Sequence, residues 1–288
     1  MERSTLAWFR AADPDPSNSL DDAALLIARL RATRHIDVIT EAHAHDFVWR
    51  HFRTPHDLCV YELRDDTAHR FILPYLVHYP GIAVVRGWPR GADRLLQSAQ
   101  VIVSPHSAAV DTLQHAYPDA HVRFAPAGVC EMDHRDEIVV AMKWPASGDA
   151  MTAALAGMAA GKAVVVFETE ETADWPALNP QTWRPRDFRG SSPIVISIDP
   201  RDEQHSLKLA MQRLSTDAAL REQLGAAARE WWNTRATVDH AVQAWEAILA
   251  EARTLPPPSH STEWLAPEDG TARAKEILGQ FGVTVDLF

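Results

Sequence analysis

The sequence predicts an α/β protein with two lobes, each built on a doubly wound parallel sheet. Short apolar segments rich in β-branched residues alternate with helical patterns along most of the chain, which is typical of parallel sheets covered by helices. A stretch with the composition of a linker, Pro126–Asp133, interrupts this alternation. The segment Lys143–Phe167 then reads as a turn, a helix, a tight turn and a buried strand.

Residues 1–128 form the predicted N-terminal domain. Its strands and helices alternate from the first residues onward, so we expect ligands at the carboxyl ends of its strands. The expected strands are Thr5–Phe9, Ile36–Thr40, Asp57–Tyr61, Ile82–Val85, Val101–Val103 and Val122–Ala125. The expected helices are Leu20–Thr33, Ala44–Phe52, Thr67–His78, Gly91–Ser98 and His106–Ala116.

Residues 129–253 form a shorter predicted C-terminal domain, which supplies three clear strands. These strands are Ile138–Ala141, Ala163–Phe167 and Pro193–Ile198, and the closing helices are Glu203–Ser215, Asp217–Thr234 and Val238–Arg253. Pro256, Pro257 and Pro258 stop the last helix. Residues 254–288 are a Pro-rich linker and tail, with a short helix expected over Pro267–Gln280.

The segment Lys143–Phe167 contains the first candidate binding site. Pro145, Ser147 and Gly148 break the chain, Asp149 is a candidate N-cap, and Ala150–Ala160 is a run of helix formers ended by Gly161. Free N–H groups at such a helix start attract phosphate, and Lys143 and Lys162 add positive charge. The alternatives are an ordinary αβ unit that binds nothing, with Asp149 only a cap and Lys162 a solvated turn residue.

Four segments in order resemble family 4 glycosyltransferases of the GT-B fold, over about residues 5–252. KWPASGDAMTAALAGMAAGKAVVVF resembles the donor-site segment of that family, and the other three segments are Tyr61–Gly81, Val101–Val129 and Ser206–Trp232. The resemblance implies two Rossmann-like lobes, the C-terminal one shortened, because Val129 and Ile138 are almost adjacent where the family places further strands and a diphosphate-binding cation. It also implies a cleft between the strand ends.

The resemblance implies a function in polysaccharide biosynthesis. A glycosyltransferase of this family moves a sugar from a nucleotide-diphosphate-sugar donor to a saccharide or lipid-linked acceptor, by a retaining reaction, and needs no other cofactor. The implied donor-binding residues are Lys143, Ser147, Gly148, Asp149 and Lys162. The implied acceptor-side residues are Ser17, Asn18, Ser19, His69 and Arg86. No residue is assigned a catalytic role.

Several positions depart from the family pattern. Ser17–Asp22 replaces a glycine turn, Arg86 stands where the family has a histidine, and the second glutamate of a paired-glutamate pattern falls at or near Ala156. Arg86 could bind an anion at the cleft or lie on the surface, and a lone helical histidine such as His69 is more often structural. A catalytically degenerate homologue that acts as a binding or scaffold partner is therefore the alternative function. A nucleotide-sugar epimerase is a third, less favoured one.

Composition narrows the classes of partner. The formal net charge of −11 argues against a general nucleic-acid binder. Two cysteines, Cys59 and Cys130, suit a reduced compartment and small apolar packing. The 14 histidines show no metal-ligand spacing, since His43 and His45 would not share a helix face. Trp231 and Trp232 are expected in the core.

The N-terminus lacks a signal-peptide pattern and no apolar run reaches about 20 residues. We therefore expect a cytoplasmic protein with no membrane span, and peripheral membrane contact stays open. The isolated chain should be slow or inactive, with a partner subunit or a second copy completing the cleft. Ile277, Leu278 and Phe281 of the tail could dock that partner, or the tail could fold back over the N-terminal lobe.

Overall fold

The computed structural model describes residues 4–13, 21–64, 66–86, 95–129, 136–142, 148–186 and 191–258, with the backbone alone for Gly148 and Asp149. Met1–Pro257 form one compact unit and Pro258–Phe288 a second. The predicted α/β class is confirmed, because the first unit contains a six-stranded and a four-stranded parallel sheet. The expected tail helix Pro267–Gln280 lies outside the described residues.

The first sheet has the strand order β2-β1-β3-β4-β5-β6, and all its neighbouring strands are parallel. Its strands are β1 (Thr5–Phe9), β2 (His35–Ile39), β3 (Leu58–Leu63), β4 (Ile82–Val85), β5 (Val101–Ser104) and β6 (His121–Phe124). The helices are α1 (Asp22–Leu30), α2 (Ala44–Arg53), α3 (Ile72–His78) and α4 (Ser107–Ala116), with short 3₁₀ turns η1 (Glu41–His43), η2 (Thr67–His69) and η3 (Leu95–Ser98). Every predicted strand of this lobe is present within one or two residues.

The second sheet has the order β7-β8-β10-β9, also parallel throughout. Its strands are β7 (Ile138–Ala141), β8 (Ala163–Phe167), β9 (Ala177–Leu178) and β10 (Val195–Ile198). Its helices are α5 (Gly148–Ala159), α6 (Glu203–Thr216) and α7 (Ala218–Arg235), with 3₁₀ turns η4 (Glu170–Thr172) and η5 (Pro200–Asp202). The two-residue strand β9 was not predicted, because it is too short to show a period.

Both sheets are covered on both faces, as the alternation of their buried side chains requires. In β1, Leu6 and Trp8 face one apolar core while Ala7 and Phe9 face another. In β8, Val164 packs with α5 and α7, and Val165 packs with α6 on the opposite face. A period of two with both faces buried identifies doubly wound sheets.

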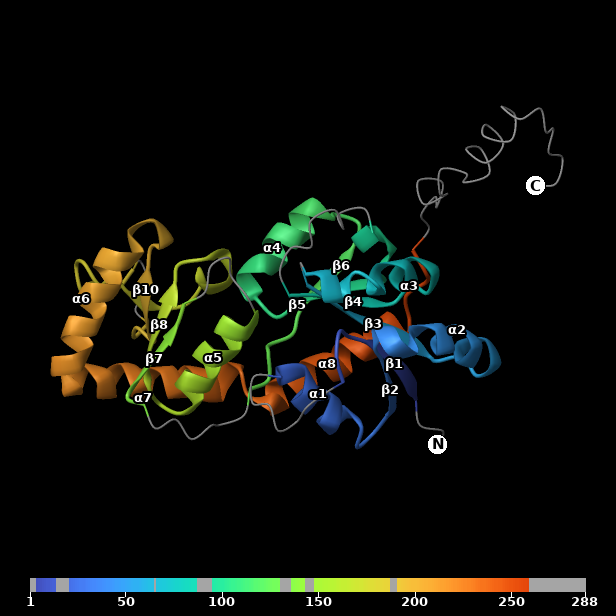
Figure 1. Cartoon of the computed structure of the whole chain (residues 1–288), viewed down its shortest axis with the longest axis horizontal. Helices are drawn as coiled ribbons and strands as arrows, with labels where there is room; N and C mark the ends of the chain where they lie inside the picture. The colour runs from blue at the N-terminus through green and yellow to red at the C-terminus, as the bar shows by residue number, and fades with distance from the viewer. Residues whose placement is uncertain are drawn as a thin grey trace, which may run out of the picture. The chain divides into compact units, whose positions relative to one another are not determined.

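The last helix of the unit, α8 (Val238–Ala252), follows α7 directly but packs on the first sheet (Figure 1). Trp245 lies against Trp8 with ring centroids 4.9 Å apart, and Leu249 is fully buried in the same core. The core of the six-stranded sheet thus includes residues that lie inside the predicted range 129–253. The α7–α8 junction therefore lies beside both sheets.

Three predicted helices differ from the structure. Of the helix expected over Gly91–Ser98, residues 91–94 lie outside the described residues and the rest is the 3₁₀ turn η3. The single helix expected over Thr67–His78 is split into η2 and α3. Pro74 lacks the N–H that a continuous helix would need there, and the break places it in the first turn of α3, where no N–H is required. Helix α5 begins at Gly148, so Asp149 lies inside its first turn. The prediction that Asp149 is the N-cap residue of this helix is therefore wrong.

Candidate functional site

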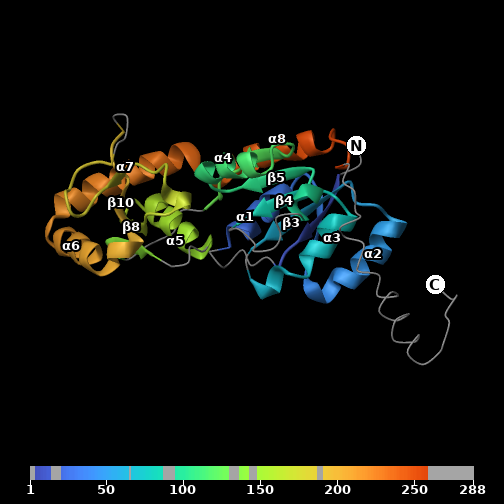
Figure 2. The ribbon, with the colours of Figure 1, turned by 90° about the horizontal axis from the view of Figure 1, so that it is seen from above.

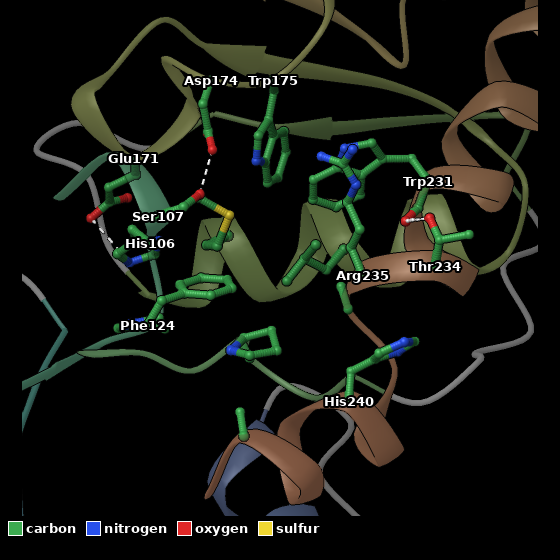
Figure 3. Close-up of a pocket in the computed structure, with 17 residues that line it drawn as sticks. His106, Ser107, Phe124, Glu171, Asp174, Trp175, Trp231, Thr234, Arg235 and His240 are labelled. Carbon is green, nitrogen blue, oxygen red and sulfur yellow. Dashed lines mark hydrogen bonds and ion pairs between the residues drawn. The ribbon is translucent and has the colours of Figure 1, made fainter. Parts of the chain in front are cut away.

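A cavity of about 470 Å³ opens where the carboxyl ends of three strands meet the α7–α8 junction. Ser107 follows β5, Phe124 ends β6, and Glu171 follows β8. Met151 from the first turns of α5 also lines the cavity, as does His240 from α8, which is labelled in Figure 3. Carboxyl ends of parallel strands are where ligands bind in doubly wound folds, so this pocket is the candidate functional site.

Polar side chains from both sheets meet inside the pocket. His106 Nε2 lies 3.7 Å from Glu171 Oε1, and the Ser107 hydroxyl donates a hydrogen bond to Asp174 (Figure 3). His106 is held by local geometry, because its backbone N–H donates to Ser104 Oγ at 3.1 Å at the end of β5. These contacts join the loop after β5 to the loop after β8.

The two titratable groups that face each other here are shifted in opposite directions. Burial, reinforced by the positive charge of Arg86, lowers the pKa of His106 to about 4. Burial, reinforced by neighbouring Glu170, raises the pKa of Glu171 above its ordinary value. His106 is therefore neutral near pH 7. Perturbed groups gathered in one pocket are a feature of binding and catalytic sites.

Aromatic side chains form the other wall of the pocket. The rings of Trp175 and Trp231 have centroids 5.5 Å apart at an interplanar angle of 58°, and the Arg235 guanidinium lies 5.6 Å from the Trp231 ring. Trp175 is buried, whereas Trp231 is partly exposed. Tryptophan faces of this kind suit flat apolar surfaces, including those of sugar rings and nucleobases.

Replacing His106 by glutamine should flatten the pH dependence of stability between about pH 6.5 and 4. The pKa of His106 is lower in the folded than in the unfolded chain, so the unfolded state binds more protons in this window and the wild type loses stability as pH falls. The wild type should lose about 1–3 kcal/mol more than the variant on acidification. Urea unfolding at a series of pH values measures this.

The control for this experiment is His205→Gln, which changes an exposed histidine on α6. Its pH profile should follow the wild type. The raised pKa of Glu171 acts with the opposite sign, so the comparison uses the difference between wild type and variant. A His106→Gln profile parallel to the wild type would show that His106 is not held neutral in the fold.

A network of buried charges lies next to the pocket, at the carboxyl edge of the first sheet. Arg10 follows β1 and donates to both carboxylate oxygens of Asp21, at 2.8 and 2.9 Å. Arg86 follows β4 and donates to both oxygens of Asp22, each at 2.7 Å. Glu62 accepts a hydrogen bond from Trp8 Nε1 at 2.7 Å.

This network occupies the point where the strand order reverses. The chain leaves β1 toward β2 on one side, and β3 lies on the other side. In open α/β sheets such a switch point is a common ligand site. Here Arg10 pairs with both Asp21 and Glu62 across it.

The sequence-predicted site residues fall into three groups. Ser17, Asn18, Ser19, Lys143 and Ser147 lie outside the described residues. Gly148 and Asp149 form the start of α5, whose Met151 lines the pocket. Of the predicted site residues that the structure describes, this helix start and Arg86, whose charge acts on His106, lie near the pocket.

The remaining three predicted residues have other positions. His69 is buried in η2, with Nδ1 2.6 Å from Asp66 Oδ1. The Arg86 side chain is 8% exposed and pairs with Asp22, so its predicted surface alternative is wrong. Lys162 precedes β8, at the opposite end of that strand from Glu171.

Sequence reasoning missed the pocket residues His106, Glu171, Asp174 and Trp175, and assigned Trp231 to the core. One signal for them was present, since the first three follow strands whose carboxyl ends were expected to bind ligands. The core assignment of the neighbouring tryptophan is confirmed, because Trp232 is buried beside α5 and β8. Cys59 is buried as expected, and burial raises the pKa of its thiol to about 11; Cys130 lies outside the described residues.

Comparison with known proteins adds no family. No protein-family model matches the chain, and no curated protein matches it at significant similarity.

In the described part of the chain, none of the helices has both the length and the apolar character needed to cross a bilayer. Across the same residues, no group of three or more His, Cys, Asp or Glu side chains is arranged to hold a metal ion. The fold and pocket thus define a two-sheet α/β protein with an aromatic, carboxylate-containing site.

Proposed function

We propose that the chain binds a nucleotide-diphosphate sugar in this pocket and is a divergent glycosyltransferase of the GT-B type, shortened in its second lobe. The observation that carries the proposal is the pocket at the carboxyl ends of β5, β6 and β8, where tryptophan faces and carboxylates converge. The sequence resemblance to family 4 glycosyltransferases supports it independently.

Each part of such a ligand has a partner of suitable chemistry. Trp231 offers a partly exposed ring face for the base or the sugar ring. Glu171 and Asp174 offer acceptors for sugar hydroxyl groups. The start of α5 lies one turn from Met151 of the pocket, and the first N–H groups of any helix have no partner within the helix, which favours phosphate.

In the proposed reaction the bond from the anomeric carbon to the diphosphate breaks, and a bond to an acceptor oxygen forms as that hydroxyl passes its proton to the departing diphosphate. The protein has to stabilise the departing diphosphate, orient the sugar and exclude water. Lys143 and the start of α5 are proposed for the diphosphate. Asp174, positioned through Ser107, is proposed to hold the sugar. The acceptor is a saccharide or a lipid-linked saccharide.

One observation favours the alternative, a binding homologue with little activity. Among the described residues that line the pocket, Arg235 is the only arginine or lysine, and its guanidinium stacks on Trp231. Stabilisation of the leaving group then depends on Lys143 and the start of α5. We therefore expect slow or absent transfer by the chain alone, below the usual range of about 1–10³ s⁻¹. We propose that a partner subunit or a second copy of the chain raises the rate of transfer.

Two pocket variants test the proposed site. Asp174→Asn removes a charge while keeping the shape, and Trp231→Ala removes a ring face. Each should weaken nucleotide-sugar binding by about tenfold or more, because a charge-assisted hydrogen bond or a stacked ring contributes roughly 1–3 kcal/mol. Calorimetric titration measures the dissociation constants.

The matched control is Trp49→Ala, which removes an exposed tryptophan of α2 outside the pocket. It should bind the donor as the wild type does. Release of nucleoside diphosphate and transfer to saccharide acceptors, measured on the same proteins, separates an enzyme from a binding homologue. If both pocket variants bound the donor with the affinity of the wild type, the donor site would have to lie outside this pocket.

A further inference from the structure

Helix α2 carries an apolar stripe on its exposed face. Val48, Trp49 and Phe52 are 39%, 70% and 82% exposed, and they are three of the five large exposed apolar residues in the described part of the chain. Phe52 follows Trp49 by three residues and Val48 by four, so these side chains share one face of the helix, together with exposed His45. Single exposed apolar residues are common, but a stripe with two aromatic rings marks an interaction surface.

The opposite face of α2 is firmly anchored. Phe47 is fully buried, and its ring packs against Phe9 and Tyr79 with centroids 4.8 and 5.1 Å away. Ala44, three residues earlier, is buried beside it. The helix therefore presents its stripe outward from a fixed position.

A groove adjoins the stripe and extends the apolar surface. Helices α2 and α3 lie side by side (Figure 2), and a groove of about 580 Å³ between them is lined by Val48 together with Phe71, Pro74 and Tyr75. Val48 belongs to both the stripe and the groove. The combined surface is therefore wider than one helix.

Basic side chains gather at one end of this surface, in a chain whose net charge is −11, and carboxylates lie at its other end and beside Arg50, which acts on Asp37. Arg50 and Arg53 are exposed at the end of α2, and Arg70 is exposed just before α3. Asp46 and Glu41 lie at the beginning of the same segment. Tryptophan and phenylalanine flanked by arginine are typical of helices that lie in the surface of a bilayer.

We propose that the α2 stripe and the adjoining groove dock on an anionic lipid surface. Trp49 and Phe52 enter the headgroup layer, and Arg50 and Arg53 pair with lipid phosphates. The distant negative charges of the protein are screened, because their effect falls off within about 8–10 Å at physiological salt. If the proposed function holds, this placement selects the lipid-linked acceptor over the free saccharide.

The test uses the full chain and vesicles of phosphatidylcholine, with and without phosphatidylglycerol, in a sedimentation assay. The wild type should bind the vesicles with phosphatidylglycerol, and more weakly as salt is added. Trp49→Ser with Phe52→Ser should weaken binding by about tenfold or more per aromatic ring. Arg50→Gln with Arg53→Gln should weaken binding and reduce its dependence on salt. Val140→Ser, on an exposed position of β7, should change nothing.

Thermal unfolding of each variant checks that it is folded, and nucleotide-sugar titration without vesicles checks the pocket separately. If the proposed function is wrong but the docking proposal is right, the wild type will bind vesicles and will not bind any nucleotide sugar. The docking proposal is overturned if the wild type does not bind either vesicle, or if the aromatic double variant binds as the wild type does. It is equally overturned if that variant only converts a dimer to a monomer, which would make the stripe a protein interface.

Discussion

Replacing Arg86 by methionine should lower the free energy of unfolding by about 3–5 kcal/mol, because the change leaves a buried carboxylate without its partner. Asp22 is 2% exposed, and Arg86 donates to both of its oxygens at 2.7 Å. Methionine keeps much of the arginine volume, so the loss reports on the charge rather than on a cavity. Urea unfolding at neutral pH measures it.

Two further variants make this test specific. Adding Asp22→Asn to Arg86→Met should recover most of the lost stability, since the unpaired charge is removed with its partner. Arg201→Met breaks a solvent-exposed pair with Asp199, so its cost should be far smaller than that of Arg86→Met. If Arg86→Met cost no more than Arg201→Met, the switch point would not be held by this ion pair.

Replacing Gly225 by alanine should cost about 3 kcal/mol or more, although alanine is the better helix former by about 1 kcal/mol. A Cβ atom at this position of α7 would lie 2.0 Å from the carbonyl oxygen of Gly161, which is backbone and cannot rotate away. Gly161 itself has φ +67°, so the turn that it forms has little freedom to shift. Urea unfolding detects the loss.

Ala226→Ser, on the exposed side of α7, is the matched control and should change stability by less than about 0.5 kcal/mol. The comparison separates the close approach of α7 to the α5–β8 turn from any general effect of altering the helix. A Gly225→Ala protein as stable as the wild type would show that α7 does not approach this turn so closely.

Most of the fold could be predicted because local pattern and tertiary structure agree. The run of valines at positions 164–166 is buried on both faces of the second sheet, as a continuous apolar strand indicates. The departures have local causes that a period does not show. Strand β9 has only two residues, and the split of the helix near Pro74 depends on where the next helix restarts.

The packing of α8 on the first sheet could not be predicted from its pattern. Its apolar residues show that it has a buried face, but nothing in their spacing says which sheet covers it. The contact of Trp245 with Trp8 joins residues that are far apart in the sequence. His240 lines the pocket because α8 packs on the first sheet, so its place in the site could not be predicted from the sequence either.

The site itself was predicted only in part. The start of α5 was found because glycine, proline and small polar residues mark a helix N-terminus in the sequence. Glu171 and His106 were missed because their relation depends on two loops meeting, and their shifted pKa values depend on burial. Arg86 was expected either to bind an anion at the cleft or to lie on the surface, and the structure pairs it with Asp22 because α1 begins beside the end of β4.

Calorimetric titration of the full chain with a panel of nucleotide-diphosphate sugars tests the central proposal most directly. We expect at least one member of the panel to bind, and Lys143→Ala to weaken that binding by about tenfold or more through loss of a charge-assisted hydrogen bond to the diphosphate. Lys208→Ala, on α6, should leave the affinity unchanged. Absence of binding by every member of the panel would contradict the proposed function, and equal affinity in Lys143→Ala would remove Lys143 from the site.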